Sequence, residues 1–485
     1  MKLSDLLTNL CPPALRDKDI ADISLDSRLI KPGALFLALP GTQLNGQAFI
    51  DEAMQKGAAA VLIEAENDAV NWHRTLPVIS IPELKARVGE LAARFYDYPA
   101  KKMRIAGVTG TSGKTSCTQI VGAILHRLQV PCGIVGTLGN GLYGTIHASS
   151  LTTPDAITLQ RTLADFVQQG AKIAAMEVSS HSLDQGRVNG IGFTVGVFTN
   201  LTRDHLDYHG TMKAYGEAKK RLFIQTSHAV INADDAFGRE IIASLPPSQP
   251  IFGFSIEKNN SLANMYAEKC YFDHTGIRAK LITPWGEGDL FSPLVGQFNL
   301  SNLLAALTTV CLLDVPFKTA LNCLSHITPA PGRMQFLRAE GKPLIVVDYA
   351  HKPDALEKVL ITLRQQCHGK LYCVLGCGGD RDRGKRPLMA KIAEQYADGV
   401  VVTDDNPRHE DPKQIVIDML EGFSGSVSVI VEHDRFKAIR DTIQYAGPDD
   451  YVLIAGKGAE MYQQIGNEKI PFSDLAVVKE ILDRR

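Results

Sequence analysis

The stretch Arg104–Thr115, RIAGVTGTSGKT, organises the rest of the chain. An apolar run leads into a turn that holds Gly110 and Gly113, and Lys114 and Thr115 follow at once. A stripe of apolar residues then recurs at helical spacing, at Ile120, Val121, Ile124, Leu125 and Leu128. A strand, a glycine turn and a helix in this order predict a phosphate-binding loop, because backbone N–H groups and the helix N-terminus then face an anion.

Inside this loop, Lys114 is expected to reach the outer phosphates of a nucleotide, and the hydroxyl of Thr115 can bind Mg²⁺. The usual loop has four residues between its first glycine and the Gly-Lys pair, whereas Gly110 stands only three positions before Gly113. A plain structural turn is the alternative. The apolar strand before the loop and the amphipathic helix after it favour nucleotide binding.

The composition excludes several classes of protein. A chain of 485 residues is too long for one core and predicts about three domains. The net charge of −2 implies no general field for nucleic acid. Nine scattered cysteines without C-x-x-C spacing predict a reducing compartment and argue against disulfides or structural zinc. With neither a signal peptide nor an apolar run near ~20 residues, we expect a cytoplasmic protein without membrane insertion.

Residues 1–88 are predicted to form a first, small α/β domain with strands at 34–39 and 59–63. Its polar loops at 26–28 and 41–46 are either solvated turns or contacts for a pyrophosphate or uracil-like group, and local chemistry leaves both open. A helix is expected from Leu84 to Tyr96.

The second predicted domain comprises residues 89–330, and a linker is expected near its start, at 98–102. The domain alternates apolar strands with helical stripes, which predicts a parallel sheet covered on both faces. Ligands of such sheets bind at the carboxyl ends of strands. The strand at 173–176 ends at Glu177, and the strand at 195–198 runs into a histidine-rich loop that holds His205. Both side chains are candidate ligands of a nucleotide-bound metal. The alternatives are a helix N-cap for Glu177 and a hydrogen-bonded loop histidine for His205.

Three further features of this domain are ambiguous. Basic residues on a helix usually mark a solvated face, so spacing alone places Lys219, Lys220 and Arg221 there. Residues 245–295 are predicted to be peripheral, with short β-like pieces. Asn299 and Asn302 stand at the start of a predicted helix. Their side chains either cap this helix or hydrogen-bond a nucleobase.

The third predicted domain, residues 331–485, follows the hinge-like Ala330–Arg333. Its strands are expected at 344–347, 372–375, 400–402, 427–431 and 452–455. Loops rich in charge or glycine follow four of them, at 348–354, 376–387, 403–408 and 456–460. Arginines beside acids suit a charged small molecule such as a zwitterion, because arginine binds carboxylate with two parallel hydrogen bonds. A nucleotide loop flanked by two such domains suits an ATP-driven joining reaction, in which a carboxylate becomes an acyl phosphate and an amine then displaces phosphate.

Four motifs in order, at 110–115, 176–181, 199–209 and 348–351, resemble those of the Mur ligases, and most of all the members that add the third residue of the peptide. The resemblance spans the whole chain. It implies an α/β fold of three domains: a central parallel-sheet P-loop-type ATP-binding domain, flanked by an α/β UDP-binding domain and a Rossmann-like C-terminal domain. It also explains the short phosphate loop, because the family uses the form Gly-Thr-x-Gly-Lys-Thr.

The resemblance implies ATP as co-substrate and Mg²⁺ as cofactor. The implied ATP contacts are Gly110, Thr111, Ser112, Gly113, Lys114, Thr115, Asn299, Asn302, Arg333, Asp348 and His351. The implied catalytic residues are Lys114, Lys219 and His205, and the implied metal ligands are Thr115, Glu177, His205 and Lys219. Lys219 matches a family lysine that reacts with CO₂ to form a carbamate, an anion able to bridge a second Mg²⁺. The resemblance thus overrides the solvated face that spacing alone indicates.

The resemblance also assigns the two substrates. The UDP-N-acetylmuramoyl dipeptide would contact Leu25, Ser27, Thr42, Gln43, Leu44, Thr152, Thr153, Ser179, Gln185 and Arg187. Thr42 and Leu44 stand where many relatives have His and Ala. The amine would be meso-diaminopimelate, because members that add it carry Asp-Asn-Pro-Arg, found here as Asp405, Asn406, Pro407 and Arg408, with Arg381, Gly456 and Glu460. Its distal carboxylate is absent from lysine, and an unpaired arginine would penalise lysine by roughly 1–3 kcal/mol.

The sequence therefore predicts a monomeric, ATP-dependent amide ligase of cytoplasmic peptidoglycan precursor synthesis. It would add meso-diaminopimelate to UDP-N-acetylmuramoyl-L-alanyl-D-glutamate through an acyl phosphate. The near alternatives are a lysine-adding Mur ligase and a folylpolyglutamate-type ligase. A nucleotide-gated binding or scaffold protein is the alternative from another class, and the intact Lys114, Glu177, His205 and Lys219 speak against it.

Overall fold

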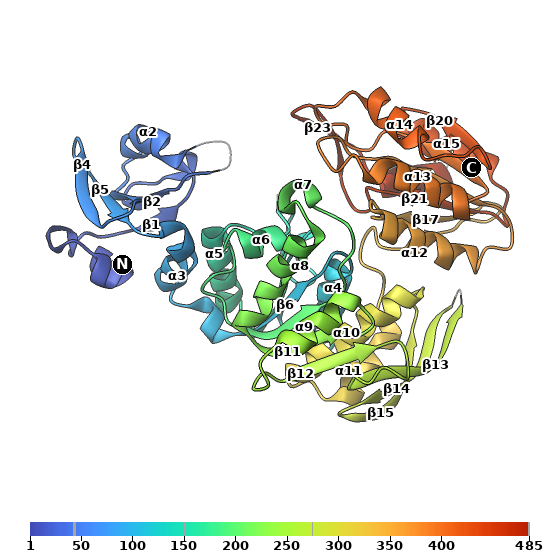
Figure 1. Cartoon of the computed structure of the whole chain (residues 1–485), viewed down its shortest axis with the longest axis horizontal. Coiled ribbons are helices and arrows are strands. Elements are labelled where there is room, and N and C mark those ends of the chain that lie inside the picture. Colours follow the sequence, from blue (N-terminus) through green and yellow to red (C-terminus); the bar gives the residue numbers. More distant parts are fainter. Residues whose placement is uncertain (42–44, 150, 274, 484–485) are drawn as a thin grey trace. The chain divides into compact units, whose positions relative to one another are not determined.

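The computed structural model describes residues 1–41, 45–149, 151–273 and 275–483, and Figure 1 follows this chain from blue to red. Contacts between residues divide it into two compact units. The first unit holds residues 1–109, 125–196 and 218–228, and the second holds 110–124, 197–217 and 229 onward.

The N-terminal sheet has the strand order β1-β2-β3-β5-β4, in which the neighbouring strands are parallel except for the antiparallel pair β4 and β5. Its strands are β1 (Asp22–Ser24), β2 (Ala34–Ala38), β3 (Ala60–Glu64), β4 (Ala69–His73) and β5 (Leu76–Ile81). Its helices are α1 (Leu3–Leu7), α2 (Ile50–Gln55) and α3 (Leu84–Phe95). Sequence patterning found β2, β3 and α3. The linker expected at 98–102 contains a 3-10 turn, Pro99–Lys102.

A ten-stranded sheet follows, with the order β15-β14-β13-β12-β11-β10-β6-β9-β7-β8. Its strands are β6 (Arg104–Thr109), β7 (Cys132–Gly136), β8 (Gly139–Leu142), β9 (Ile173–Glu177), β10 (Phe193–Phe198), β11 (Thr226–Asn232), β12 (Ile251–Ser255), β13 (Met265–Asp273), β14 (Gly276–Thr283) and β15 (Gly286–Ser292). Its helices are α4 (Lys114–Arg127), α5 (Ala156–Gln168), α6 (Ser180–Asp184), α7 (Leu206–His209), α8 (Met212–Lys220), α9 (Ala236–Ser244), α10 (Gln297–Leu312) and α11 (Phe317–Cys323).

Two expectations for this region need correction. The sheet is mixed, because β8 is antiparallel to β7 and the hairpins β13, β14 and β15 are antiparallel. Residues 245–295 are therefore part of the sheet, where β12 pairs in parallel with β11. Alternating burial along β14 shows why this segment was misjudged: half of its side chains face away from the core, so it lacks a continuous apolar run.

The C-terminal sheet has the order β16-β17-β21-β18-β19-β20 and is parallel apart from β16. Its strands are β16 (Gln335–Leu337), β17 (Leu344–Asp348), β18 (Leu371–Leu375), β19 (Gly399–Val402), β20 (Ser428–Val431) and β21 (Tyr451–Ala455), with a separate hairpin of β22 (Tyr462–Ile465) and β23 (Glu468–Pro471). Its helices are α12 (Pro353–Arg364), α13 (Lys385–Tyr396), α14 (Pro412–Leu420), α15 (Arg435–Tyr445) and α16 (Asp474–Asp483). The five strands expected from sequence are β17 to β21.

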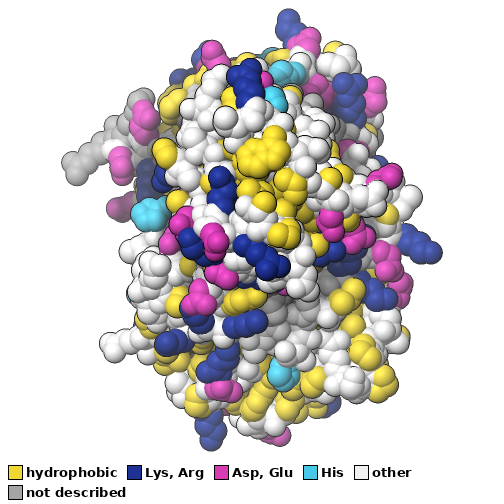
Figure 2. Space-filling model, turned by 90° about the vertical axis from the view of Figure 1, so that its left-hand side faces the viewer, with side chains coloured by type: hydrophobic (Ala, Val, Ile, Leu, Met, Phe, Trp, Pro, Cys, Tyr) yellow, Lys and Arg dark blue, Asp and Glu magenta, His cyan; other side chains and the backbone are white. Residues whose placement is uncertain are grey.

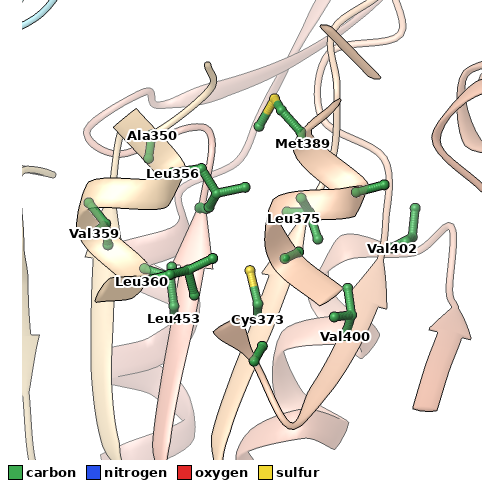
Figure 3. Close-up of a cluster of buried hydrophobic side chains, with 14 of the residues drawn as sticks. Ala350, Leu356, Val359, Leu360, Cys373, Leu375, Met389, Val400, Val402 and Leu453 are labelled. Atoms are coloured by element: carbon green, nitrogen blue, oxygen red, sulfur yellow. The ribbon is translucent and has the colours of Figure 1, made fainter. Parts of the chain in front are cut away.

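The core of this sheet shows why its strand-end loops are well supported. Figure 3 shows Leu356 and Leu360 of α12 directed toward Leu453 of β21, with Met389 of α13 above Leu375 of β18. All five side chains are buried at 0% exposure. Close packing of this kind resists displacement, so the loops at the carboxyl ends of these strands start from fixed positions.

The distribution of surface charge and the length of the apolar helices can be compared with what the composition predicts. On the face drawn in Figure 2, acidic and basic side chains are interspersed rather than gathered into a field of one sign. Across the described ranges, no helix is both long and apolar enough to cross a bilayer.

Candidate functional site

The phosphate loop after β6 requires both of its glycines. Gly110 has φ +147° and Gly113 has φ +87°, values that side-chain-bearing residues rarely adopt. A Cβ at Gly110 would overlap the hydroxyl of Thr199, and one at Gly113 would meet the amide oxygen of Asn302. The close approach of these neighbouring side chains therefore explains why both positions are glycine.

The loop is tied to the residues that follow β10. The backbone N–H groups of Thr111 and Ser112 donate to the main-chain and side-chain oxygens of Asn200 over 2.8 Å and 2.9 Å. The hydroxyl of Thr199 donates to the carbonyl of Ser112 over 2.6 Å. The expectation that the loop after the 195–198 strand opens beside the phosphate loop is confirmed by these contacts.

Lys114 begins α4, and its ammonium group lies over the loop. It donates to the carbonyls of Gly110 and Thr111 over 2.8 Å and 3.1 Å. The buried hydroxyl of Thr115 accepts a hydrogen bond from the guanidinium of Arg333 over 3.2 Å. Three predicted ATP contacts, Lys114, Thr115 and Arg333, are thus together at the start of one helix, where anions are stabilised.

A pocket lies beside the first turns of α4. It is lined by Ser116, Gln119, Ile120, Leu294, Asn299, Thr328, Pro329, Ala330 and Arg333. The wall is mixed, because four of these residues are apolar and the other five carry hydroxyl, amide or guanidinium groups. A nucleobase contact in this pocket stays a prediction. Asn299 does not cap α10, because the N-cap is Gly296 and the Asn299 amide donates to Val295 over 2.8 Å. Asn302 donates to Asn299 within the helix, so the capping alternative is wrong for both residues.

Asp348 is the buried last residue of β17, and His351 lies half-buried in the loop that follows, so neither belongs to the lining of this pocket. The Asp348 carboxylate accepts from the backbone N–H of Met334 over 2.7 Å. Burial raises the pKa of Asp348, and the charge of Arg333 opposes that rise. Burial, with the charges of Lys352 and Lys385, holds the pKa of His351 well below its usual range, so His351 is neutral. Their direct contact with ATP stays a prediction.

The carboxylate of Glu177 ends β9 and is fixed by Thr137. Its two oxygens accept from the backbone N–H and the hydroxyl of Thr137 over 2.8 Å and 3.1 Å. Glu177 is buried at 1% exposure. Ser179, not Glu177, caps α6, so the capping alternative for Glu177 is wrong. A buried carboxylate beside a hydroxyl supplies the hard oxygen ligands that Mg²⁺ prefers.

Five of the ten predicted contacts to the UDP-linked substrate form a hydrogen-bonded cluster around Glu177. Thr152 meets the hydroxyl of Thr137 over 3.1 Å, and the hydroxyl of Thr153 donates to the Glu177 carbonyl over 2.8 Å. Ser179 donates its backbone N–H to Thr153 over 3.2 Å.

Arg187 extends this cluster. Its guanidinium donates to the Thr153 carbonyl and to Gln185 over 2.9 Å each. Of the N-terminal candidates, Ser27 is buried and donates to Glu52 over 2.6 Å, and Leu25 packs against the core of its own sheet. Thr42, Gln43 and Leu44 lie outside the described residues.

His205 and Lys219, the other candidate metal ligands, differ in exposure. His205 has φ +53°, lies 3.0 Å through Nε2 from Asp204 and is 40% exposed at its side chain. Lys219 in α8 is buried at 1% exposure, so the solvated face indicated by spacing is wrong for it. Arg221 is exposed and pairs with Asp184, as that face predicted.

In the part of the chain that the structure describes, no group of three or more histidine, cysteine, aspartate or glutamate side chains is arranged to hold a metal ion. A Mur-type metal set does not need such a group, because it would combine hydroxyl, carboxylate, imidazole and carbamate ligands. The metal assignment therefore stays a prediction.

The predicted diaminopimelate contacts gather at the carboxyl end of the C-terminal sheet. Arg408 has φ +51°, and its guanidinium donates to the Gly379 carbonyl over 2.7 Å. Burial and the nearby charge of Arg381 lower the pKa of Arg408. Pro407 holds the preceding turn, in which the N–H of Gly379 bonds the Asn406 carbonyl over 2.9 Å. Arg408 is half-buried and Arg381 is exposed, and positive charge from both side chains favours a carboxylate ligand.

The other predicted diaminopimelate contacts include two carboxylates, Asp405 and Glu460, and form an acidic part of the site. Asn406 donates to Glu460 over 2.9 Å, and the fully buried Lys457 reaches both side chains over 3.0 Å. Gly456 has φ +118°, and a Cβ there would meet the Asp405 carboxylate. The buried Asp405 lies 3.6 Å from Lys457. Carboxylates beside paired arginines match a zwitterion with an additional acid group.

Sequence reasoning missed three residues at these sites. Thr137 directly follows β7, and the rule that ligands bind at strand ends would have found it had β7 been recognised. Lys352 and Lys457 lie in loops that were singled out, but nothing in their spacing distinguishes a buried lysine from a solvated one.

A glycine loop at the start of a helix, with a lysine and a threonine directed at it, defines a nucleotide-binding protein of the P-loop type, here with flanking sheets that carry candidate substrate sites. Three family models match the chain: the Mur ligase family catalytic domain over residues 19–96, the Mur ligase middle domain over 108–310, and the Mur ligase glutamate ligase domain over 332–458. The chain belongs to the Mur ligase family, whose members are ATP-dependent amino-acid ligases.

Individual relatives narrow this class. A UDP-N-acetylmuramoyl-L-alanyl-D-glutamate--2,6-diaminopimelate ligase from Coxiella burnetii is 47% identical over 484 residues, with 99% of each chain covered. A protein of the same name from Pseudomonas aeruginosa is 49% identical over 478 residues, with 98% of each covered. A solved structure of such a ligase matches at 37% identity and a TM-score of 0.71, covering 100% of this chain and 99% of its own. A folylpolyglutamate synthase from Mycobacterium tuberculosis shares the fold alone, at 19% identity and a TM-score of 0.64, with 77% of this chain and 92% of that one covered.

Proposed function

We propose that this chain joins meso-diaminopimelate to UDP-N-acetylmuramoyl-L-alanyl-D-glutamate, with ATP converted to ADP and phosphate, during peptidoglycan precursor synthesis. The observation that carries the proposal is the paired-arginine site of Arg381 and Arg408, opposed by Glu460, in a chain nearly half identical to ligases named for this reaction. Lysine has one carboxylate fewer than diaminopimelate and would leave an arginine unpaired. The folylpolyglutamate synthase is only 19% identical to this chain, against 47% and 49% for the diaminopimelate ligases.

The reaction would proceed in two balanced steps. A carboxylate oxygen of the D-glutamyl residue bonds to the γ-phosphorus, the bond from that phosphorus to the bridging oxygen breaks, and ADP leaves. The amine nitrogen of diaminopimelate then bonds to the acyl carbon, phosphate leaves with the C–O bond electrons, and the surplus amine proton is released. Lys114, placed over the loop carbonyls, supplies the charge that neutralises the transferring phosphoryl group.

Further assignments rest on the family resemblance. Bound Mg²⁺ would offset phosphate charge, with Thr115, Glu177, His205 and carbamylated Lys219 as its ligands. The cluster around Glu177 would hold the dipeptide end of the UDP-linked substrate, because Thr152, Thr153, Ser179, Gln185 and Arg187 are gathered there. The domain bounds 1–88, 89–330 and 331–485, the cytoplasmic location and the monomeric state stay predictions.

The proposal is tested by phosphate release from ATP, measured with each substrate omitted in turn. Release should require both the UDP-linked dipeptide and meso-diaminopimelate, and mass spectrometry should find the tripeptide product. Equal kcat/KM for L-lysine would contradict the choice of amine, and ATP hydrolysis independent of both substrates would contradict ligation.

Arg408 is predicted to determine the preference for meso-diaminopimelate over L-lysine. The Arg408→Ala variant should lose about 100-fold in kcat/KM for meso-diaminopimelate, because a charge-assisted pair to the distal carboxylate is worth about 1.5–3 kcal/mol. The value for L-lysine should change far less, since lysine lacks that carboxylate. Arg440→Ala is the matched control, because Arg440 is a half-buried arginine of α15 that pairs with its neighbour Asp441 outside the predicted site. Parallel losses for both amines would show that Arg408 supports the loop and does not select the amine.

A further inference from the structure

Lys352 is a buried lysine outside the predicted site. It precedes α12 at the N-cap position, and its side chain is 9% exposed. The ammonium group donates to the carbonyl of Thr111 in the phosphate loop over 3.1 Å. It also lies 2.7 Å from the Asp204 carboxylate, which lies 3.0 Å from Nε2 of His205. A residue from the C-terminal part of the chain thus reaches the loop that binds phosphate.

Lys352 and Lys114 share one acceptor. Nζ of Lys114 also donates to the Thr111 carbonyl over 3.1 Å, so the two ammonium groups lie within two hydrogen-bond lengths of each other. Like charges this close repel strongly in a buried site and favour an anion between them.

The hydrogen-bonding capacity of Lys352 is not exhausted by these contacts. A lysine ammonium has three N–H donors. Among the described residues, its partners are the Thr111 carbonyl and the Asp204 carboxylate. Asp204 fixes the direction of the side chain, and one donor remains on the group that faces the loop.

We propose that Lys352 is a second phosphate-binding cation that contacts the γ-phosphoryl group of ATP together with Lys114. This inference rests on the proposed function. As the carboxylate oxygen bonds to the γ-phosphorus and the bond to the ADP oxygen breaks, Lys352 keeps its proton and hydrogen-bonds an equatorial oxygen whose charge grows. Stabilisation of charge that develops during transfer lowers the barrier more than it strengthens ground-state binding. Asp204 acts as a positioning residue for Lys352.

Three variants test this proposal: Lys352→Ala, Lys352→Gln and the control Lys358→Ala. Glutamine keeps a hydrogen-bond donor and most of the length but removes the charge, which guards against a folding defect in the alanine variant. Lys358 is an exposed lysine of the same helix that pairs with Asp354 over 3.0 Å. The measurements are kcat and KM for ATP, and the dissociation constants of ADP and of a non-hydrolysable ATP analogue.

Both Lys352 variants should lower kcat about 100-fold, the usual effect of removing one donor to developing charge. Their affinity for ADP should stay within about twofold of wild type, while the analogue should lose its advantage over ADP, because only the analogue carries a γ-phosphate. Lys358→Ala should match wild type in every measurement. Equal weakening of ADP and analogue, or an unchanged kcat, would overturn the proposal and leave Lys352 as a structural contact. A wild-type protein that fails to ligate would instead contradict the proposed function itself.

Discussion

Replacing Lys114 with alanine is expected to lower the rate of ATP-dependent ligation by about 1,000-fold, because a fixed cation at a transferring phosphoryl group contributes effects of this order. The ammonium group of Lys114 hydrogen-bonds the carbonyls of Gly110 and Thr111, which holds it against the loop that is predicted to bind phosphate. No other lysine begins α4, and the backbone of the loop alone cannot supply a full positive charge.

The experiment measures steady-state phosphate release together with thermal unfolding of the same samples. Lys102→Ala is the matched control, because Lys102 is a partly exposed lysine at the opposite end of β6 that pairs with Asp97. The Lys114→Ala variant should unfold near the wild-type temperature and still bind the UDP-linked substrate. Retention of more than about a tenth of the wild-type rate would be incompatible with a role at the transferred phosphate.

Local sequence patterns were sufficient for much of the fold. The buried strands β2, β9, β17, β18, β19 and β21 are continuous apolar runs bounded by glycine or charge, and such runs reveal parallel strands. Strands with one exposed face, such as β14, and the exposed edge strand β4 carry no comparable signal. Their places depend on pairing between distant segments, which periodicity does not report.

The site shows the same division between local and tertiary information. The phosphate loop was predictable, because its chemistry is contiguous from Gly110 to Thr115. The burial of Lys219 and Lys352 was not, because a lysine is usually exposed and only tertiary packing reverses that preference. The family resemblance corrected the expectation for Lys219. The position of Lys352 at the phosphate loop follows only from its tertiary contact with Thr111.

The Lys219→Ala variant is expected to lose about 100–1,000-fold in ligation rate, the range for removing a group that stabilises charge in a closed site. Lys219 is buried at 1% exposure near the end of α8. Burying an ammonium group costs desolvation free energy. Reaction with CO₂ would replace this cation with a carbamate, which is an anion able to bind a metal. The loss in the variant would therefore be a loss of negative charge, although the residue written in the sequence is a cation.

This reasoning separates a carbamate from an ordinary lysine. If the missing group is an anion, then acetate or propionate should restore part of the activity of Lys219→Ala, whereas methylamine should not. Lys220→Ala is the control, because the neighbouring side chain is only half-buried and should tolerate the change. A second readout is independent of activity: ¹³C-bicarbonate should give a carbamate carbon signal in wild type and none in the variant. Near-full activity of Lys219→Ala without added carboxylate would refute the carbamate, and rescue by methylamine would assign the role to the ammonium group.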